Sequence, residues 1–167
     1  MVSPSRLALV DALARYDRLL EVGIGDRPGV ARALADRGRD VVALDVDVDE
    51  RTRAAARETE TATVAGSLRA VEGDVLALAE GTDRAGRSEL DEAGRAFDAV
   101  YACNLPAELQ RPTVAVAERL DAACLFTTLG FEEPTVPVSR RSRSGTTVYV
   151  ARDGPTGDGV PGVDGDR

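Results

Sequence analysis

Residues 18–29 read Arg18-Leu-Leu-Glu-Val-Gly-Ile-Gly-Asp-Arg-Pro-Gly29. A short apolar run ends at the acidic residue Glu21, and Gly23 and Gly25 then bracket a single residue ahead of a helical pattern. Buried parallel strands pass into helices in this way across turns whose glycines let a ligand approach the backbone closely. The stretch therefore predicts a nucleotide-binding type of turn near the start of an α/β domain.

Apolar runs and helical patterns alternate along the rest of the chain. The apolar runs predict strands over residues 19–22, 41–45, 97–102 and 123–129, and a weaker strand over 61–65 or 68–71. Helical spacing predicts helices over 5–16, 50–59 and 106–120, with Asp49 as the cap of the second and Gly38 ending the helix after the glycine turn. Residues 136–140 and 146–151 are expected to pair as a hairpin, and residues 80–95 to form a solvated excursion with at most one helical turn.

This alternation predicts an α/β fold with a doubly wound, mostly parallel, Rossmann-like sheet. Helices are expected on both faces of the sheet, and a β-hairpin at its C-terminal end. Residues 1–152 are enough for one such domain. Residues 153–167 are rich in Gly, Asp and Pro, and we expect them to form a disordered acidic tail.

The composition excludes several classes of enzyme. The chain has no His, and all 21 of its basic residues are Arg. Without His there is no Ser-His-Asp triad and no His-ligated zinc site, and we expect no metal site. Without Lys there is neither a Walker-type phosphate loop nor a Schiff base. The cysteines, Cys103 and Cys124, are expected to be reduced core thiols, although Cys103 could alternatively act as a nucleophile.

The net charge of −8 tells more about habitat than about partners. An acidic surface without Lys is typical of halophilic organisms that keep molar salt in the cytoplasm, where salt screens the repulsion between carboxylates. The same acidity gives no strong signal for nucleic-acid binding. The absence of a long apolar run predicts no membrane span, and the charged N-terminal segment predicts a cytoplasmic protein.

Polar residues follow the predicted strands, which is where ligands bind in parallel sheets. They are Glu21 with Gly23 and Gly25 after the first strand, Asp45 after the second, Asp74 after the third and Asn104 after the fourth. Two of these have an alternative interpretation: Gly73-Asp74 suits an ordinary turn, and Asn104 suits a cap of the following helix.

At these residues the chain resembles class I S-adenosylmethionine-dependent methyltransferases. Glu21-Val-Gly-Ile-Gly25 is similar to their first motif, with Arg27 in place of its third glycine, and Cys103-Asn-Leu-Pro106 stands at their fourth motif. The resemblance implies that Asp45 binds the ribose and Asp74 contacts the adenine. It also implies that Asn104 orients the methyl acceptor. The whole chain resembles, more closely, a small uncharacterised archaeal family of short Rossmann-like proteins, for which no activity is implied.

The chemistry of the turn favours S-adenosylmethionine over NAD(P) as the cofactor. A carboxylate at Glu21 suits the sulfonium and ammonium groups of S-adenosylmethionine, whereas it would repel the pyrophosphate of a dinucleotide. Asp45 fits a ribose diol in either cofactor, so it does not discriminate. The sequence leaves two hypotheses open. One is a methyltransferase that acts mainly by positioning its reactants; the other is a non-catalytic or NAD(P)-type nucleotide-binding module.

The sequence does not identify the methyl acceptor. Three arginines, Arg140, Arg141 and Arg143, lie at the expected hairpin tip. They could bind an anionic substrate, RNA included, but a solvated hairpin tip is the commoner explanation for such a group of charges.

Overall fold

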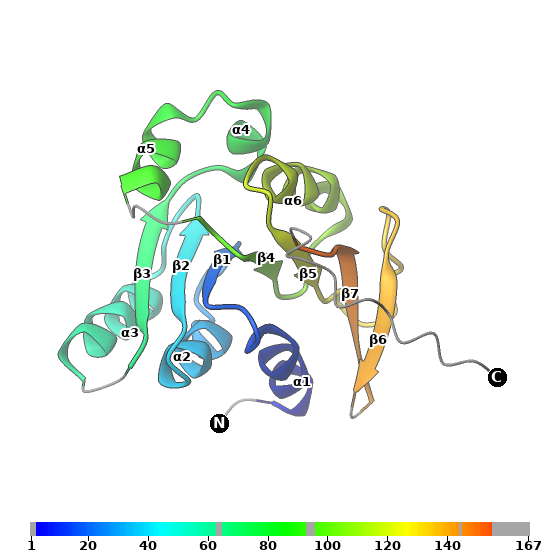
Figure 1. The fold of residues 1–167 in the computed structure, drawn as a ribbon, viewed down its shortest axis with the longest axis horizontal. Helices are drawn as coiled ribbons and strands as arrows, with labels where there is room; N and C mark the ends of the chain where they lie inside the picture. Colours follow the sequence, from blue (N-terminus) through cyan, green and yellow to red (C-terminus); the bar gives the residue numbers. More distant parts are fainter. Residues whose placement is uncertain (1–2, 63–64, 93–95, 144, 155–167) are drawn as a thin grey trace, which may run out of the picture.

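A seven-stranded sheet forms the centre of the computed structural model, which describes residues 3–62, 65–92, 96–143 and 145–154. The strand order is β3-β2-β1-β4-β5-β7-β6 (Figure 1), with β1 to β5 parallel and β7 antiparallel to both of its neighbours. The strands are β1 (Arg18–Val22), β2 (Asp40–Asp45), β3 (Ser67–Glu72), β4 (Ala99–Ala102), β5 (Ala123–Phe126), β6 (Ser139–Arg143) and β7 (Thr146–Arg152). The predicted doubly wound α/β fold is confirmed, and its strand order reverses between β1 and β4.

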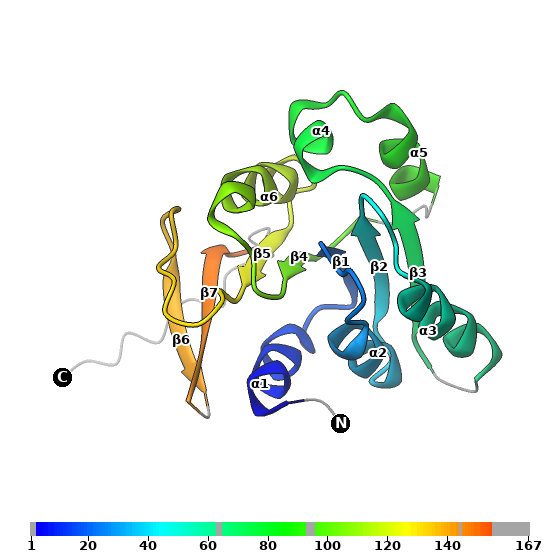
Figure 2. The same ribbon diagram turned by 180° about the vertical axis from the view of Figure 1, so that it is seen from behind.

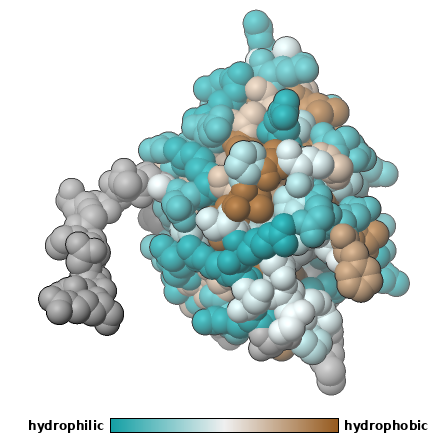
Figure 3. Space-filling view, turned by 90° about the vertical axis from the view of Figure 1, so that its right-hand side faces the viewer, coloured by the Kyte–Doolittle hydropathy of each residue, from teal (hydrophilic) through white to brown (hydrophobic). Residues whose placement is uncertain are grey.

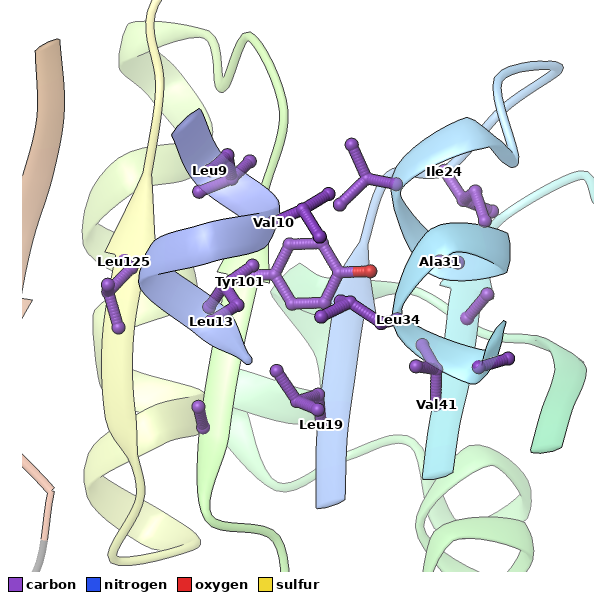
Figure 4. Close-up of a cluster of buried hydrophobic side chains, with 14 of the residues drawn as sticks. Leu9, Val10, Leu13, Leu19, Ile24, Ala31, Leu34, Val41, Tyr101 and Leu125 are labelled. Atoms are coloured by element: carbon purple, nitrogen blue, oxygen red, sulfur yellow. The ribbon is translucent and has the colours of Figure 1, made fainter. Parts of the chain in front are cut away.

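Helices cover both faces of the sheet, as Figures 1 and 2 show from opposite sides. One face carries α1 (Pro4–Leu13), α2 (Gly29–Asp36) and α3 (Glu50–Thr61), and the other carries α4 (Val75–Glu80), α5 (Arg84–Glu92) and α6 (Ala107–Arg119). Each layer buries its own apolar cluster against the sheet. In the first cluster the ring of Tyr101 packs between Val10 and Leu13 of α1 and Leu34 of α2 (Figure 4).

Local sequence signals explain where the first three helices begin and end. The Ser3 hydroxyl accepts a hydrogen bond from the Arg6 amide at the start of α1, and Asp49 caps α3, as predicted, by accepting from the Arg51 amide. Gly38 follows α2 with φ of +84°, so it ends that helix in the left-handed conformation, as predicted.

Three elements differ from the sequence-based expectation. The 80–95 segment, expected to have at most one helical turn, contributes the two-turn helix α5, which anchors Leu90 in the core. Strand β5 ends at Phe126 rather than Leu129; beyond it the Thr127 hydroxyl accepts from the Asn104 backbone amide, and the Thr128 hydroxyl donates to the Glu132 carbonyl. Pro112 within the predicted 106–120 helix favours a helix that starts there or is kinked there, but α6 begins earlier, at Ala107, and includes Pro112; its buried residues are Gln110, Thr113, Val116 and Ala117.

The C-terminal hairpin is shifted relative to its predicted register. Arg141 and Arg143 lie within β6, not in the tip, and every residue of this edge strand is exposed. Arginine side chains on an edge strand discourage pairing with other chains. The predicted acidic tail lies outside the described residues apart from Asp153 and Gly154. Within the described ranges, no helix combines the length and apolarity needed to cross a membrane.

The side chain of Gln110 joins helix α6 to the segment that leads into the hairpin. It is fully buried, its Nε2 donates to the Leu105 carbonyl (3.2 Å), and its Oε1 accepts from the Thr135 amide (2.7 Å). The Oε1 atom therefore joins α6 to the segment before the hairpin, and the Nε2 atom holds the residue that precedes α6.

Replacing this residue, Gln110→Leu, should lower the free energy of unfolding by about 1–3 kcal/mol, because it leaves the carbonyl of the buried Leu105 and the amide of Thr135 without these hydrogen bonds. Urea denaturation measures this. Thr128→Val, which removes an exposed hydrogen bond to the Glu132 carbonyl, serves as the control and should change stability by less than about 0.5 kcal/mol. Equal stability of Gln110→Leu and the wild type would contradict the bridging role.

Candidate functional site

The glycine turn lies at the carboxyl end of β1, beside the point where the strand order reverses. Gly23 and Gly25 have φ of +72° and +54°, in the left-handed region that other residues adopt at a cost. A Cβ placed on Gly23 would meet no atom within 4 Å, and one on Gly25 would meet only Asp45 Oδ2, at 4.0 Å. The turn is therefore open on the side where these Cβ atoms would project, and a ligand can approach its backbone there.

Hydrogen bonds hold this turn to the neighbouring strand and to α3. The Gly23 amide donates to the Leu44 carbonyl (2.8 Å), and the Gly25 amide donates to Asp45 Oδ2 (2.7 Å). The buried hydroxyl of Thr52 donates to the Gly25 carbonyl (2.6 Å). The half-buried Asp45 carboxylate thus lies at the edge of the turn, as expected from its position after β2.

The Glu21 carboxylate lies beneath the turn rather than on its surface. Glu21 is 1% exposed and lies opposite Tyr101 of β4 in the register of the two strands. The Tyr101 hydroxyl donates to Oε2 (2.9 Å) and the Cys103 thiol to Oε1 (3.6 Å). Burial raises the pKa of Glu21 from 4.5 to about 7, against the opposing effect of the two hydrogen bonds and of the Arg6 charge. Any attraction of a cationic ligand to Glu21 therefore acts without direct access to the carboxylate from solvent, and it depends on pH.

The two cysteines are free thiols. Burial, and then the neighbouring Glu21 charge, raise the pKa of Cys103 well above its usual range, while burial raises that of Cys124 to about 12. The thiolate is the nucleophilic form, so these environments disfavour nucleophilic chemistry. The geometry accords with reduced core thiols.

Asp74 has a structural task at the end of β3. Its carboxylate accepts from the Leu76 amide (2.9 Å) and so caps α4. Gly73 is needed for packing, because a Cβ there would lie 2.7 Å from Leu44 Cδ1. The contact between Asp74 and an adenine stays a prediction.

Asn104 follows β4 in the left-handed conformation, with φ of +52°. Its backbone amide donates to the Thr127 hydroxyl (2.9 Å), and this hydrogen bond joins the segments after β4 and β5. The interpretation of Asn104 as the cap of the following helix is wrong, because the N-cap residue of α6 is Pro106 and no side chain caps this helix. Asn104 instead lines a cavity.

That cavity has a volume of about 560 Å³ and lies beyond the carboxyl ends of β4 and β5. Its walls come from the first turns of α1, the segments after β4 and β5, and the hairpin. Most of the side chains are polar; they include Ser5, Arg6, Cys103, Asn104, Thr127, Thr128, Glu132, Glu133, Arg140, Thr146 and Thr147. Phe131, fully exposed, also borders the cavity. From the β6 side the surface is largely hydrophilic around a small hydrophobic area (Figure 3).

A second cavity, of about 520 Å³, lies between α2, α3 and the start of α1. Four arginines line it: Arg6, Arg27, Arg32 and Arg51. Two carboxylates, Asp26 and Glu58, pair with Arg27 (3.8 Å) and Arg32 (2.7 Å). This cavity is positively charged in a chain of net negative charge. Nowhere in the described ranges do three potential metal ligands converge.

The structure thus brings together most of the predicted site residues, but in two groups. Gly23, Gly25 and Asp45 form the open turn, and Asn104 lies across the switch point beside the first cavity. The sequence reasoning missed Arg6 and the threonines after β5. It also missed the Glu21–Tyr101 pair, which the alternation of side chains along two adjacent strands could have suggested.

The Glu21 pKa predicts how stability depends on pH. The folded state holds a proton that the unfolded state releases above pH 4.5, so this stabilisation is complete below about pH 4.5 and is lost as the pH rises through about 7. Glu21→Gln cannot titrate. Relative to that variant, the wild type should lose roughly 3 kcal/mol of unfolding free energy between about pH 4.5 and 8.

Urea denaturation at several pH values, at constant potassium chloride, measures this difference. Glu60→Gln, at an exposed glutamate of α3, is the matched control and should follow the wild type at every pH. Parallel pH profiles for Glu21→Gln and the wild type would show that Glu21 does not hold the proton.

Solved methyltransferases share this fold. An RNA methyltransferase from Salinibacter ruber in complex with S-adenosylhomocysteine superposes with a TM-score of 0.54 and 20% identity, over 95% of this chain and 98% of that one. An O-methyltransferase family protein from Burkholderia thailandensis gives a TM-score of 0.58 and 16% identity, over 90% of this chain. The chain spans 56% of the length of that protein. At these identities the similarity establishes the fold alone.

The sequence relatives are closer. The model of an uncharacterised protein family, UPF0146, matches residues 91–153. The UPF0146 proteins of two strains of Halobacterium salinarum are 42% identical to this chain over 154 residues, which are 92% of this chain and 99% of each relative. The archaeal family anticipated from the sequence is thereby confirmed: the chain belongs to the uncharacterised protein family UPF0146.

Proposed function

We propose that this protein binds S-adenosylmethionine at the glycine turn and transfers its methyl group to a small polar acceptor. The observation that carries the proposal is the open side of Gly23 and Gly25, with the Asp45 carboxylate at its edge. A cofactor can lie against the backbone there and offer its ribose hydroxyls to Asp45. The fold of methyltransferases, one of them with S-adenosylhomocysteine bound, supports the assignment.

The chain's own residues divide into a cofactor side and an acceptor side. Asp74 lies after β3, farther along the sheet edge from the turn than Asp45, where we propose that it contacts the adenine. Asn104 borders the 560 Å³ cavity on the other side, where its amide group can orient an acceptor. Glu21 lies beneath the turn, and we propose that its ionised form favours a cationic cofactor from below. The bound cofactor would supply the activated methyl group.

The absence of His and Lys is compatible with this chemistry. Transfer of a methyl group from a sulfonium requires that nucleophile, methyl and leaving group be held in line, so positioning supplies much of the rate. The polar cavity beyond β4 and β5 offers hydroxyl and amide groups for such positioning.

A nucleotide-binding module of the NAD(P) type is the second candidate, and the second cavity favours it. Arg27 and Arg51 border the start of α2, whose N-cap, Pro28, makes no side-chain bond. Arginines and a helix N-terminus suit phosphates. The buried Glu21 carboxylate, moreover, does not face a pyrophosphate. Thermal-shift assays separate the candidates: S-adenosylmethionine and S-adenosylhomocysteine should raise the melting temperature, and NAD and NADP should not.

We also propose that the protein works in a cytoplasm of high salt. Its acidic, Lys-free composition and its free cysteines suit such a compartment, and its relatives come from Halobacterium salinarum. Binding experiments therefore belong in molar potassium chloride.

The glycine turn gives the first test of cofactor binding. Gly23→Ala should cost about 1–2 kcal/mol of stability through its left-handed φ, and it places a methyl group where the cofactor lies. Calorimetric titration should show S-adenosylmethionine binding at least about tenfold more weakly, a loss of about 1.4 kcal/mol.

Gly38→Ala is the matched control, since Gly38 shares the left-handed conformation but lies at the opposite end of the strands. It should lose similar stability and keep full affinity. If Gly23→Ala and Gly38→Ala bound S-adenosylmethionine with equal affinity, this result would contradict binding of the cofactor against the glycine turn.

Asp45 gives a second test. Asp45→Asn keeps an oxygen that can accept from the Gly25 amide but removes the charge, so the fold should persist while affinity for S-adenosylmethionine falls about tenfold or more. Asp40→Asn, at the other end of β2, removes a charge that bonds only to the Ser67 hydroxyl among the described residues, and affinity should not change. Unaltered affinity in Asp45→Asn would exclude Asp45 as the ribose ligand.

A further inference from the structure

Arg6 occupies an unusual position in the first turn of α1. Its side chain is half-buried and lines both the 560 Å³ cavity and the arginine-rich cavity on the far side of the glycine turn. Capping by Ser3 fixes the start of this helix, so the backbone that carries Arg6 is well defined. Arg6 thus borders both cavities, one together with Cys103 and Asn104 and the other together with Arg27.

The charges around Arg6 leave it available to a ligand. Of the two arginines in the first cavity, Arg140 is paired with Glu133 (2.5 Å) and lies over the Tyr149 ring. Arg6 makes no ion pair with any residue in the described part of the chain. Arg6 lines this cavity together with Cys103, whose thiol donates to Glu21. A half-buried guanidinium facing a cavity without a carboxylate partner is suited to bind an anion.

The other charges favour a singly charged anion. Glu132 and Glu133 border the same cavity, and the buried Glu21 accepts a hydrogen bond from Cys103, which also borders it. These carboxylates would repel a phosphate dianion more strongly than a carboxylate. One guanidinium fork can hold one carboxylate through two parallel hydrogen bonds. The remaining lining, largely hydroxyl and amide groups, is compatible with a small polar ligand.

We infer that Arg6 binds the carboxylate of a ligand in this cavity, a role that rests on the proposed function and deepens it. Two sources can supply that group: the amino-acid end of S-adenosylmethionine, or a methyl acceptor that carries a carboxylate. In either case Arg6 fixes one end of a reactant by a charge-assisted bidentate contact. It acts as a binding residue and takes no part in the bond changes.

Arg6→Gln, titrated with S-adenosylmethionine and with its decarboxylated analogue, tests the first source. If Arg6 holds the cofactor, the variant should bind S-adenosylmethionine about tenfold to a hundredfold more weakly than the wild type does. It should bind the decarboxylated analogue as well as the wild type does. Arg15→Gln is the matched control. Arg15 lies just after the C-terminal end of α1, where it stacks on the Tyr16 ring, and it lines neither cavity.

Acetate tests the second source. In NMR spectra of the arginine side chains, acetate should shift the Arg6 signal of the S-adenosylhomocysteine-loaded protein if the acceptor supplies the carboxylate. The same titration of the unloaded protein tests Arg6 independently of any cofactor, so it remains informative if S-adenosylmethionine does not bind and the proposed function fails. The role of Arg6 is overturned if Arg6→Gln leaves cofactor affinity unchanged and acetate shifts no Arg6 signal in either state.

Discussion

The hydrogen bond from the Gly25 amide to Asp45 Oδ2 ties together the parts on which this site depends. It joins the turn after β1 to the end of β2, while the Thr52 hydroxyl holds the Gly25 carbonyl from α3. Two left-handed glycines are needed for the backbone to follow this path. The constraint fixes an open backbone surface at the switch point and leaves the Asp45 carboxylate at its edge, so the turn and its acidic neighbour form one unit.

Beneath that unit lies a polar cluster in an otherwise apolar layer. Tyr101 and Cys103 each donate a hydrogen bond to Glu21 among the side chains that α1 and α2 bury against the sheet. Burial favours the protonated form of this carboxyl group. The two hydrogen bonds offset only part of the desolvation cost of its ionised form. The Glu21 carboxyl group is therefore the part of the proposed site whose protonation changes near neutral pH.

The sequence predicted the turn and the strand ends because both follow local rules. Gly23, Gly25 and Asp45 each stand at a strand terminus marked by an apolar run, and Asp49 caps α3 as short-range capping preferences require. The contact between Glu21 and Tyr101, 80 residues away, follows from the alternation of side chains only once β1 and β4 are known to be neighbours in this register. The cavity likewise needs α1, the ends of β4 and β5, and the hairpin to meet in space. The roles of Arg6 and Thr127 are therefore properties of the assembled fold.

The central claim is that a cofactor of the S-adenosylmethionine type lies against the glycine turn. Backbone amide NMR spectra of the protein in molar potassium chloride, recorded during a titration with S-adenosylhomocysteine, test it most directly. We expect the largest chemical-shift changes at the backbone amides of Gly23, Gly25 and Asp47, which lie in or beside the turn. The absence of shifts there, with NAD instead shifting the amides of Arg27 and Gly29, would contradict it and identify a dinucleotide-binding protein.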